Sequence, residues 1–191
     1  MSAHTNSWHQ REARKFKKAY QLLPPCIHET GGVWADIGCG EGIFTAILYE
    51  LLGQKSVIYA IDKNARALRV LERNFNMNRP EANLHPIQAD FTHALSIPPL
   101  DGLVLANALH FIPDKQKVDV IKNLAENLKP DGKLILIEYN SRFGNLAVPF
   151  PLSQEQFLEL AQELQLRNPQ IVARAPSSFM GEMYAAIANS P

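Results

Sequence analysis

From residue 33 onward, the chain alternates short apolar runs with segments in which apolar residues recur at helical spacing. This alternation is typical of βαβ units and predicts a mainly parallel sheet with helices on its two faces. Continuous apolar runs fit strands that are buried on both sides. The clearest runs are VWADI, SVIYAID, DGLVLANAL and GKLILIEYN, and the clearest helical segments are GIFTAILYELL, NARALRVLERNFNMN, PDKQKVDVIKNLAENL and SQEQFLELAQELQL.

The end of the chain predicts a departure from the parallel pattern. The last two apolar runs, QIVARAP and GEMYAAIAN, are separated only by SSFMG. A link this short cannot contain a crossover helix, so the two runs should form an antiparallel hairpin. With a weaker strand at ANLHPIQAD, the predicted fold is α/β: a doubly wound, mainly parallel seven-stranded sheet with an antiparallel C-terminal hairpin.

The segment before the first strand is the most basic part of the chain. Phe16, Tyr20 and Leu23 recur among its arginines and lysines, which predicts an amphipathic helix that ends before Pro24. We favour a solvated helix packed on the domain edge over a contact with phosphate or nucleic acid. The predicted organisation is an N-terminal helical cap at residues 1–29 and one globular domain at residues 30–191.

Charge and cysteine content narrow the possible partners. The 191 residues hold 19 basic and 19 acidic side chains, so the broad positive field of a nucleic-acid binder is missing, and a nucleic-acid partner is unlikely. Cys26 and Cys39 have no metal-ligand spacing, so we expect free thiols and no metal. Neither a membrane-spanning run nor a leader segment is evident. We therefore expect a cytoplasmic protein, either a monomer or a homodimer.

The stretch VWADIGCGEGIF, residues 33–44, contains three glycines after an acid, Asp36. It follows the first predicted strand, and open parallel sheets bind ligands outside such strand ends. Glycines let a backbone approach a ligand closely, and the next helix presents free N–H groups. A dinucleotide site requires G-x-G-x-x-G, but Ile43 occupies the third glycine position here. Asp36 would repel a diphosphate and attract a ligand that carries an amine and a sulfonium.

The motif VWADIGCGEG resembles the first motif of class I S-adenosylmethionine (SAM)-dependent methyltransferases, and the likeness covers roughly residues 30–140. ALHFI, after the fourth strand, resembles the LHxx signature of the small-molecule branch of that family. The resemblance implies a Rossmann-like methyltransferase fold and SAM as cofactor, with S-adenosylhomocysteine (SAH) as its product. It also implies in-line transfer of the methyl group to a small-molecule acceptor.

The same resemblance implies which residues bind the cofactor. Asp36 and the backbone of Gly38, Cys39 and Gly40 would face its amino acid part, with Gly42 completing the motif. Asn107, at the end of LVLAN, would lie near the methyl group.

At the nucleoside end, the carboxylate of Asp62 would accept hydrogen bonds from both ribose hydroxyls. Lys63 would lie against the adenine edge, Asp90 would accept from the adenine amino group, and Phe91 would flank the ring. Each acid also has a simpler interpretation as a helix or turn cap. Three acids at the ends of three successive strands favour the cofactor interpretation.

For the chemistry itself, His110 is the candidate general base, required only if the acceptor must lose a proton. A packed histidine with a satisfied hydrogen bond is the alternative at this position. Glu138 and Tyr139 end the fifth strand and could line the acceptor pocket, although Glu138 could instead anchor a neighbouring loop.

Two segments are expected to complete the acceptor pocket. One is the N-terminal helix, with Trp8, Phe16 and Tyr20. The other is the irregular segment SRFGNLAVPFPLS, in which Arg142 could hold an anionic acceptor and Phe143 could supply an apolar wall.

Three other functions remain open from the sequence alone. The chain could be a non-catalytic SAM-binding module, because a fold and a cofactor do not determine function. An NAD-dependent oxidoreductase is disfavoured by Asp36 and by the missing third glycine. Methylation of RNA is disfavoured because the sequence after the fourth strand is NALH rather than an NPPY-type motif.

Overall fold

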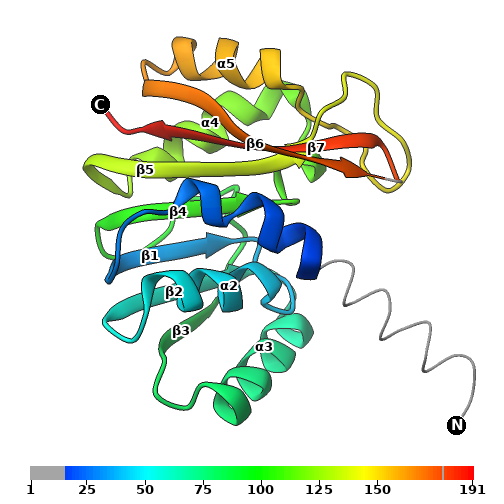
Figure 1. The fold of residues 1–191 in the computed structure, drawn as a ribbon. Helices are drawn as coiled ribbons and strands as arrows, with labels where there is room; N and C mark the ends of the chain where they lie inside the picture. Colours follow the sequence, from blue (N-terminus) through cyan, green and yellow to red (C-terminus); the bar gives the residue numbers. More distant parts are fainter. Residues whose placement is uncertain (1–15, 178) are drawn as a thin grey trace, which may run out of the picture.

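The structure is a computed structural model that describes residues 16–177 and 179–191 (Figure 1). Trp8, one of the predicted pocket residues, lies outside the described residues. The seven strands are β1 (Gly32–Ile37), β2 (Ser56–Asp62), β3 (Asn83–Gln88), β4 (Leu100–Ala106), β5 (Leu128–Tyr139), β6 (Arg167–Ser177) and β7 (Gly181–Asn189). The α-helices are α2 (Ile43–Leu52), α3 (Ala65–Asn78), α4 (Asp114–Ala125) and α5 (Gln154–Glu163), and the 3₁₀ turns are η1 (Pro24–Cys26) and η2 (Leu109–Phe111). Residues 16–22 are also helical, and we call them the N-terminal helix.

The strands form one sheet in the order β3-β2-β1-β4-β5-β7-β6. Neighbours from β3 to β5 pair in parallel, whereas β7 is antiparallel to both β5 and β6. The predicted doubly wound sheet with its antiparallel C-terminal hairpin is confirmed. The winding changes direction between β1 and β4, so the carboxyl ends of these two strands mark the place where such a sheet binds its ligand.

Two hydrophobic cores sandwich the sheet, because successive residues of each strand point to opposite faces. Trp34 packs on one face with the N-terminal helix, α2 and α3, while its neighbour Ala35 packs on the other face with α4 and α5. Leu22, the last residue of the N-terminal helix, and Leu23, which follows it, are fully buried in the first core. This part of the chain therefore packs against the same sheet as the rest.

The helix starts have identifiable caps. The Asn64 side chain accepts hydrogen bonds from the amides of Arg66 and Ala67, so Asn64 is the N-cap of α3. Ser153 and Gln156 form a capping box at the start of α5. In the described residues, no helix combines the length and apolar character needed to cross a membrane.

The structure differs from the sequence prediction at the start of β5. The apolar pattern predicts a strand from Gly132, but β5 begins at Leu128 and contains an irregularity in its pairing with β4, between Leu100 and Gly102. Asp131 adopts a φ of +67° there. A pattern of alternating side chains cannot reveal a strand that continues across a bulge, because the bulge breaks the alternation.

Candidate functional site

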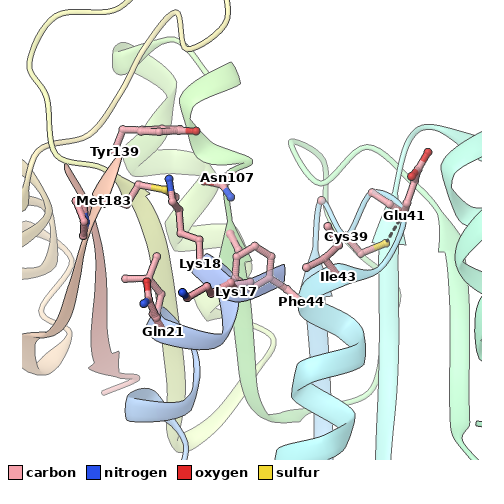
Figure 2. Close-up of a pocket in the computed structure, with 16 residues that line it drawn as sticks. Lys17, Lys18, Gln21, Cys39, Glu41, Ile43, Phe44, Asn107, Tyr139 and Met183 are labelled. Carbon is pink, nitrogen blue, oxygen red and sulfur yellow. Dashed lines mark hydrogen bonds between the residues drawn. The ribbon is translucent and has the colours of Figure 1, made fainter. Parts of the chain in front are cut away.

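A cleft of about 710 Å³ lies at the carboxyl ends of β1, β4 and β5 (Figure 2). This volume is within the range of small-molecule sites. The strand ends and the loop after β1 form one side, and the N-terminal helix forms the other. The lining residues are Lys17, Lys18, Ala19, Gln21, Leu22, Gly38, Cys39, Gly40, Glu41, Ile43, Phe44, Ala106, Asn107, Tyr139, Pro176 and Met183.

Residues 38–42, which we call the glycine loop, border the cleft. Two positions in this loop favour glycine for different reasons. At Gly38, with φ +71°, an added Cβ would lie 2.6 Å from the Cβ of Ala108, so the loop packs directly on the segment after β4. At Gly40, with φ +56°, an added Cβ would meet nothing within 4 Å. The backbone there is exposed to ligand-sized space, and its positive φ favours glycine. Gly42 lies behind the cleft as the N-cap residue of α2.

Asp36 is almost completely buried, with 1% of its surface exposed, and it does not line the cleft. Its Oδ2 accepts a hydrogen bond from the Thr45 hydroxyl at 2.6 Å. Burial raises the pKa of Asp36 to about 7; the Thr45 hydrogen bond opposes this shift, and the nearby charge of Asp62 adds to it. Asp36 therefore lies beneath the loop, where it influences the cleft through its charge rather than by contact.

Asp62 holds the glycine loop to the end of β2. Its Oδ2 accepts from the amide of Gly40 at 2.8 Å, and its Oδ1 accepts from the amide of Asn64 at 2.8 Å. Asn64 caps α3 with its own side chain, so Asp62 is not the N-cap residue. An ionised carboxylate accepts about four hydrogen bonds, and each oxygen of Asp62 therefore retains capacity for a ligand hydroxyl.

The other predicted nucleoside residues lie near one another, outside the cleft lining. Asp90 Oδ1 accepts from the amide and the hydroxyl of Thr92, and these bonds hold the pKa of Asp90 below its usual range. Its Oδ2 lies 3.8 Å from the Lys63 ammonium. The ring of Phe91 lies 3.5 Å from the position of an added Cβ at Gly38.

Asn107 follows the last residue of β4 directly and lies at the centre of the cleft, in a backbone conformation with φ +53° (Figure 2). Its Oδ1 is buried and, among the described residues, has no hydrogen-bond partner. A buried acceptor without a donor is costly, and such groups usually mark a bound ion, a water or a ligand. An ammonium donor on a ligand would satisfy this oxygen.

Cys39 also lines the cleft, although its thiol is not reactive. Burial, together with the charges of Asp36 and Asp62, raises the pKa of Cys39 far above its usual value. The thiol therefore stays protonated, and its contribution is packing beside the exposed backbone.

His110 and Glu138 form a buried pair beside the cleft. The His110 Nδ1 lies 2.8 Å and 3.0 Å from the two carboxylate oxygens of Glu138, which also accept from the amides of His110 and Tyr139. Only 4% of His110 and 0% of Glu138 is exposed, and neither residue lines the cleft. Donation from Nδ1 leaves Nε2 as the ring atom that can accept a proton.

Tyr139 is the predicted acceptor residue that does line the cleft. Its ring contacts His110 edge-on at 5.8 Å and Phe179 at 6.0 Å between centroids. Figure 2 shows its hydroxyl directed across the cleft toward the side where Asn107 lies. Burial and the charge of Glu138 raise the pKa of Tyr139, so its hydroxyl stays protonated and can donate a hydrogen bond.

Four other predicted pocket residues do not line the cleft. Phe16 and Tyr20 stack on each other at 6.0 Å on the outer side of the N-terminal helix, with 39% and 48% of their surfaces exposed. Arg142 and Phe143 lie in the exposed segment after β5. In the helix, the residues between the aromatic positions face the cleft instead.

Sequence reasoning missed several residues that do line the cleft. Lys17, Lys18 and Gln21 contribute from the N-terminal helix, and Pro176 and Met183 contribute from the C-terminal hairpin. The sequence predicted a basic helix, but it did not predict which residues of that helix would face the cleft. Met183 enters because β7 pairs it directly with Tyr139.

A smaller cleft of about 400 Å³ lies at the amino ends of the strands, away from the glycine loop. Its lysines, Lys129 and Lys133, are paired with Asp101 and Glu29. Within residues 16–177 and 179–191, no group of three or more histidines, cysteines or acids is arranged to hold a metal ion.

Comparison with known proteins shows the family to which the chain belongs. Residues 35–132 match the family model described as a methyltransferase domain, so the chain belongs to the methyltransferase-domain family. It is a member of the class I SAM-dependent methyltransferases, whose methyl donor is SAM.

The chain is similar to enzymes with different acceptors. One, from Methanothermobacter thermautotrophicus, is named "Probable cobalt-precorrin-6B C(15)-methyltransferase (decarboxylating)" and is 29% identical over 61% of this chain and 58% of its own length. Another is a tRNA1(Val) (adenine(37)-N6)-methyltransferase from Tolumonas auensis, 28% identical over 66% of this chain and 54% of its own. A ribosomal protein L11 methyltransferase from Carboxydothermus hydrogenoformans is 32% identical over 62% of this chain and 37% of its own. The match therefore spans between 37% and 58% of the length of these relatives.

The fold is similar to that of solved methyltransferases. The N-methyltransferase NodS from Bradyrhizobium japonicum, in complex with SAH, superposes with a TM-score of 0.74 at 19% identity and covers 92% of this chain and 86% of its own.

The described residues fit SAM as donor. Asn107 Oδ1 supplies a buried acceptor for an ammonium, and the carboxylates of Asp36 and Asp62 lie behind the loop, where a sulfonium and an ammonium would be attracted. Asp62 retains acceptor capacity for ribose hydroxyls.

Proposed function

We propose that this protein transfers a methyl group from SAM to a small-molecule acceptor. The observation that carries the proposal is the buried Asn107 Oδ1, without a partner among the described residues, at the centre of a cleft bordered by the glycine loop. The cleft is large enough to hold a donor and a small acceptor together. SAM supplies an activated methyl group when bound, so the protein must orient the acceptor and exclude water.

A small molecule is favoured over RNA or protein by the charge and shape of the molecule. The chain has zero formal net charge, and within residues 16–177 and 179–191 the acceptor side of the cleft is built by a helix and a hairpin alone. The tRNA and ribosomal-protein relatives nevertheless make both macromolecules the obvious competitors to include in a test.

We also propose His110 as the general base for an acceptor that carries a proton. Its Nδ1–H donates to Glu138, which leaves Nε2 to accept a proton. Because the His110 ring contacts the Tyr139 ring, the acceptor must bind at the edge of the cleft that Tyr139 lines. His110→Asn should slow methyl transfer to such an acceptor by about 100-fold or more, while the affinity for SAH stays unchanged.

The test of the proposed function combines donor binding with a screen for turnover. Calorimetry should show that SAM and SAH bind, and isotopically labelled SAM should label at least one member of a metabolite library. Transfer of label only to tRNA or to a ribosomal protein would contradict the small-molecule assignment. Binding of SAH without turnover of any acceptor would favour the non-catalytic module, and no binding of either nucleoside would refute the donor assignment.

A further inference from the structure

The cleft has two ends of opposite charge. At the end formed by the glycine loop, Glu41 lies near the opening, and the carboxylates of Asp36 and Asp62 lie behind the loop. At the other end, Lys17 and Lys18 project from the N-terminal helix. Figure 2 shows this separation, with Glu41 beyond Cys39 and both lysines on the far side of the cleft. A cationic donor fits the acidic end and leaves the basic end for the acceptor.

The basic end is rich in hydrogen-bond donors. Among residues 16–177 and 179–191, no carboxylate lies within ion-pair distance of Lys17 or Lys18. In Figure 2 the Lys18 side chain rises toward the side of the cleft occupied by Tyr139 and Met183. The protonated Tyr139 hydroxyl adds a further donor on that side. An anionic group placed between this ammonium and this hydroxyl would have both a compensating charge and a hydrogen bond.

The surroundings of the basic end are apolar. Pro176 and Met183 line the cleft beside Tyr139. Most of the large apolar side chains that are exposed in the described residues lie on segments at this edge: the N-terminal helix, η2, the segment after β5 and the β6–β7 turn (Figure 1). They are Phe16, Tyr20, Phe111, Phe143, Leu146, Phe150 and Phe179, whereas Met77 on α3 and Leu158 on α5 lie elsewhere. Apolar area exposed around a cleft commonly marks a binding surface.

We propose that the methyl acceptor is an amphipathic anion, a small molecule with an apolar body and an anionic group that lies between the Lys18 ammonium and the Tyr139 hydroxyl. The proposal rests on the methyltransferase function above, because it assigns the cationic donor to the acidic end of the cleft. It specifies the acceptor class by charge and polarity, while the atom that receives the methyl group is a separate question.

The test uses the full chain saturated with SAH and titrated with two probes of equal chain length, octanoate with an anionic head group and octanamide with a neutral one. Calorimetry should show that octanoate binds at least about tenfold more tightly than octanamide. Lys18→Met, which keeps the apolar stem, should remove this preference, and Lys18→Arg should keep it. Lys122→Met, at an exposed lysine of α4, is the matched control and should behave as the wild type.

The outcomes separate this inference from the proposed function. If SAH binds but octanoate and octanamide bind equally, or neither binds, the acceptor class is wrong and the donor assignment stands. If Lys18→Met weakens SAH rather than octanoate, the lysine holds the carboxylate of the donor, and the inference is refuted. If SAH does not bind, the proposed function and the inference fail together.

Discussion

Three acids stand at the ends of neighbouring strands, yet each has a different local environment. Asp36 is buried with one hydroxyl donor, Asp62 holds two backbone amides, and Asp90 is bonded by Thr92. These differences follow from depth, since Asp36 lies inside β1 and Asp90 lies beyond the end of β3. The three residues should therefore respond differently to substitution.

Asp62→Ala should weaken SAH binding by about 10–100-fold. The substitution removes a charged acceptor for ribose hydroxyls, and hydrogen bonds to charged groups contribute about 1.5–3 kcal/mol. Calorimetry measures the affinity for SAH. A thermal melt measures the stability lost when the Gly40 and Asn64 amides no longer have their acceptor. Asp119→Ala, at an exposed acid of α4, is the control. Unchanged SAH affinity in a folded Asp62→Ala variant would refute the ribose assignment.

Asp36→Asn should make the unliganded protein more stable by about 2–4 kcal/mol at pH 8, but by only about 1 kcal/mol at pH 4.5. The carboxyl has a pKa of about 7 in the folded state and an ordinary pKa of 3.8 in the unfolded chain, so the folded state binds the extra proton between these two pH values. The Asp36 contribution is therefore fully present below pH 3.8 and is lost as the pH rises through 7. Asparagine can still accept from the Thr45 hydroxyl.

Urea denaturation of both proteins at the two pH values measures this difference, with Asp119→Asn as a control that should show none. The same Asp36→Asn variant should bind SAM more weakly, because the negative charge behind the loop is gone. Equal stability of the variant and the wild type at pH 8 would show that Asp36 is not held in a desolvated state.

Among the elements, the segment after β5 is held at one end and exposed at the other. Lys117, on α4, is 2% exposed and donates to Asp114 and to the carbonyls of Phe150 and Pro151. The carbonyl of His110 accepts from the amide of Phe150. Residues 142–147, in contrast, are exposed throughout. The anchored end, at Phe150, is hydrogen-bonded to His110 of the buried His110–Glu138 pair. A change in the exposed residues 142–147 therefore need not disturb that pair.

Lys117→Met should destabilise the protein by about 2–4 kcal/mol, because two carbonyls lose their donor in a buried site. It should also increase proteolytic cleavage in residues 141–153, since this segment loses its anchor. Urea denaturation and limited proteolysis measure the two effects. Lys115→Met, at an exposed position on the same helix, should show neither effect, and an unchanged cleavage rate in Lys117→Met would contradict the anchoring role.

For the whole molecule, the sequence predicted what short-range patterns determine. Apolar periodicity was sufficient to predict the order of the strands along the chain, and the short link SSFMG was sufficient to predict the C-terminal hairpin. The His110–Glu138 contact spans 28 residues and depends on β4 lying beside β5. The pairing of Tyr139 with Met183 depends on β7 inserting next to β5. Such contacts leave no local pattern, so the acceptor side of the cleft was the part predicted least well.

Donor binding should stabilise the whole molecule while protecting only one edge of its sheet. At about 100 times its Kd, SAH should raise the free energy of unfolding by about 2.7 kcal/mol, which thermal melts at several SAH concentrations can test. Hydrogen exchange should slow at residues 38–42 and in the N-terminal helix, which border the cleft. The smaller cleft at the amino edge, near Gly31 and Gly132, serves as an internal control and should show no local change. Protection found only around the smaller cleft would show that SAH binds there. That result would refute the assignment of the larger cleft as the donor site, even if the melting temperature rose.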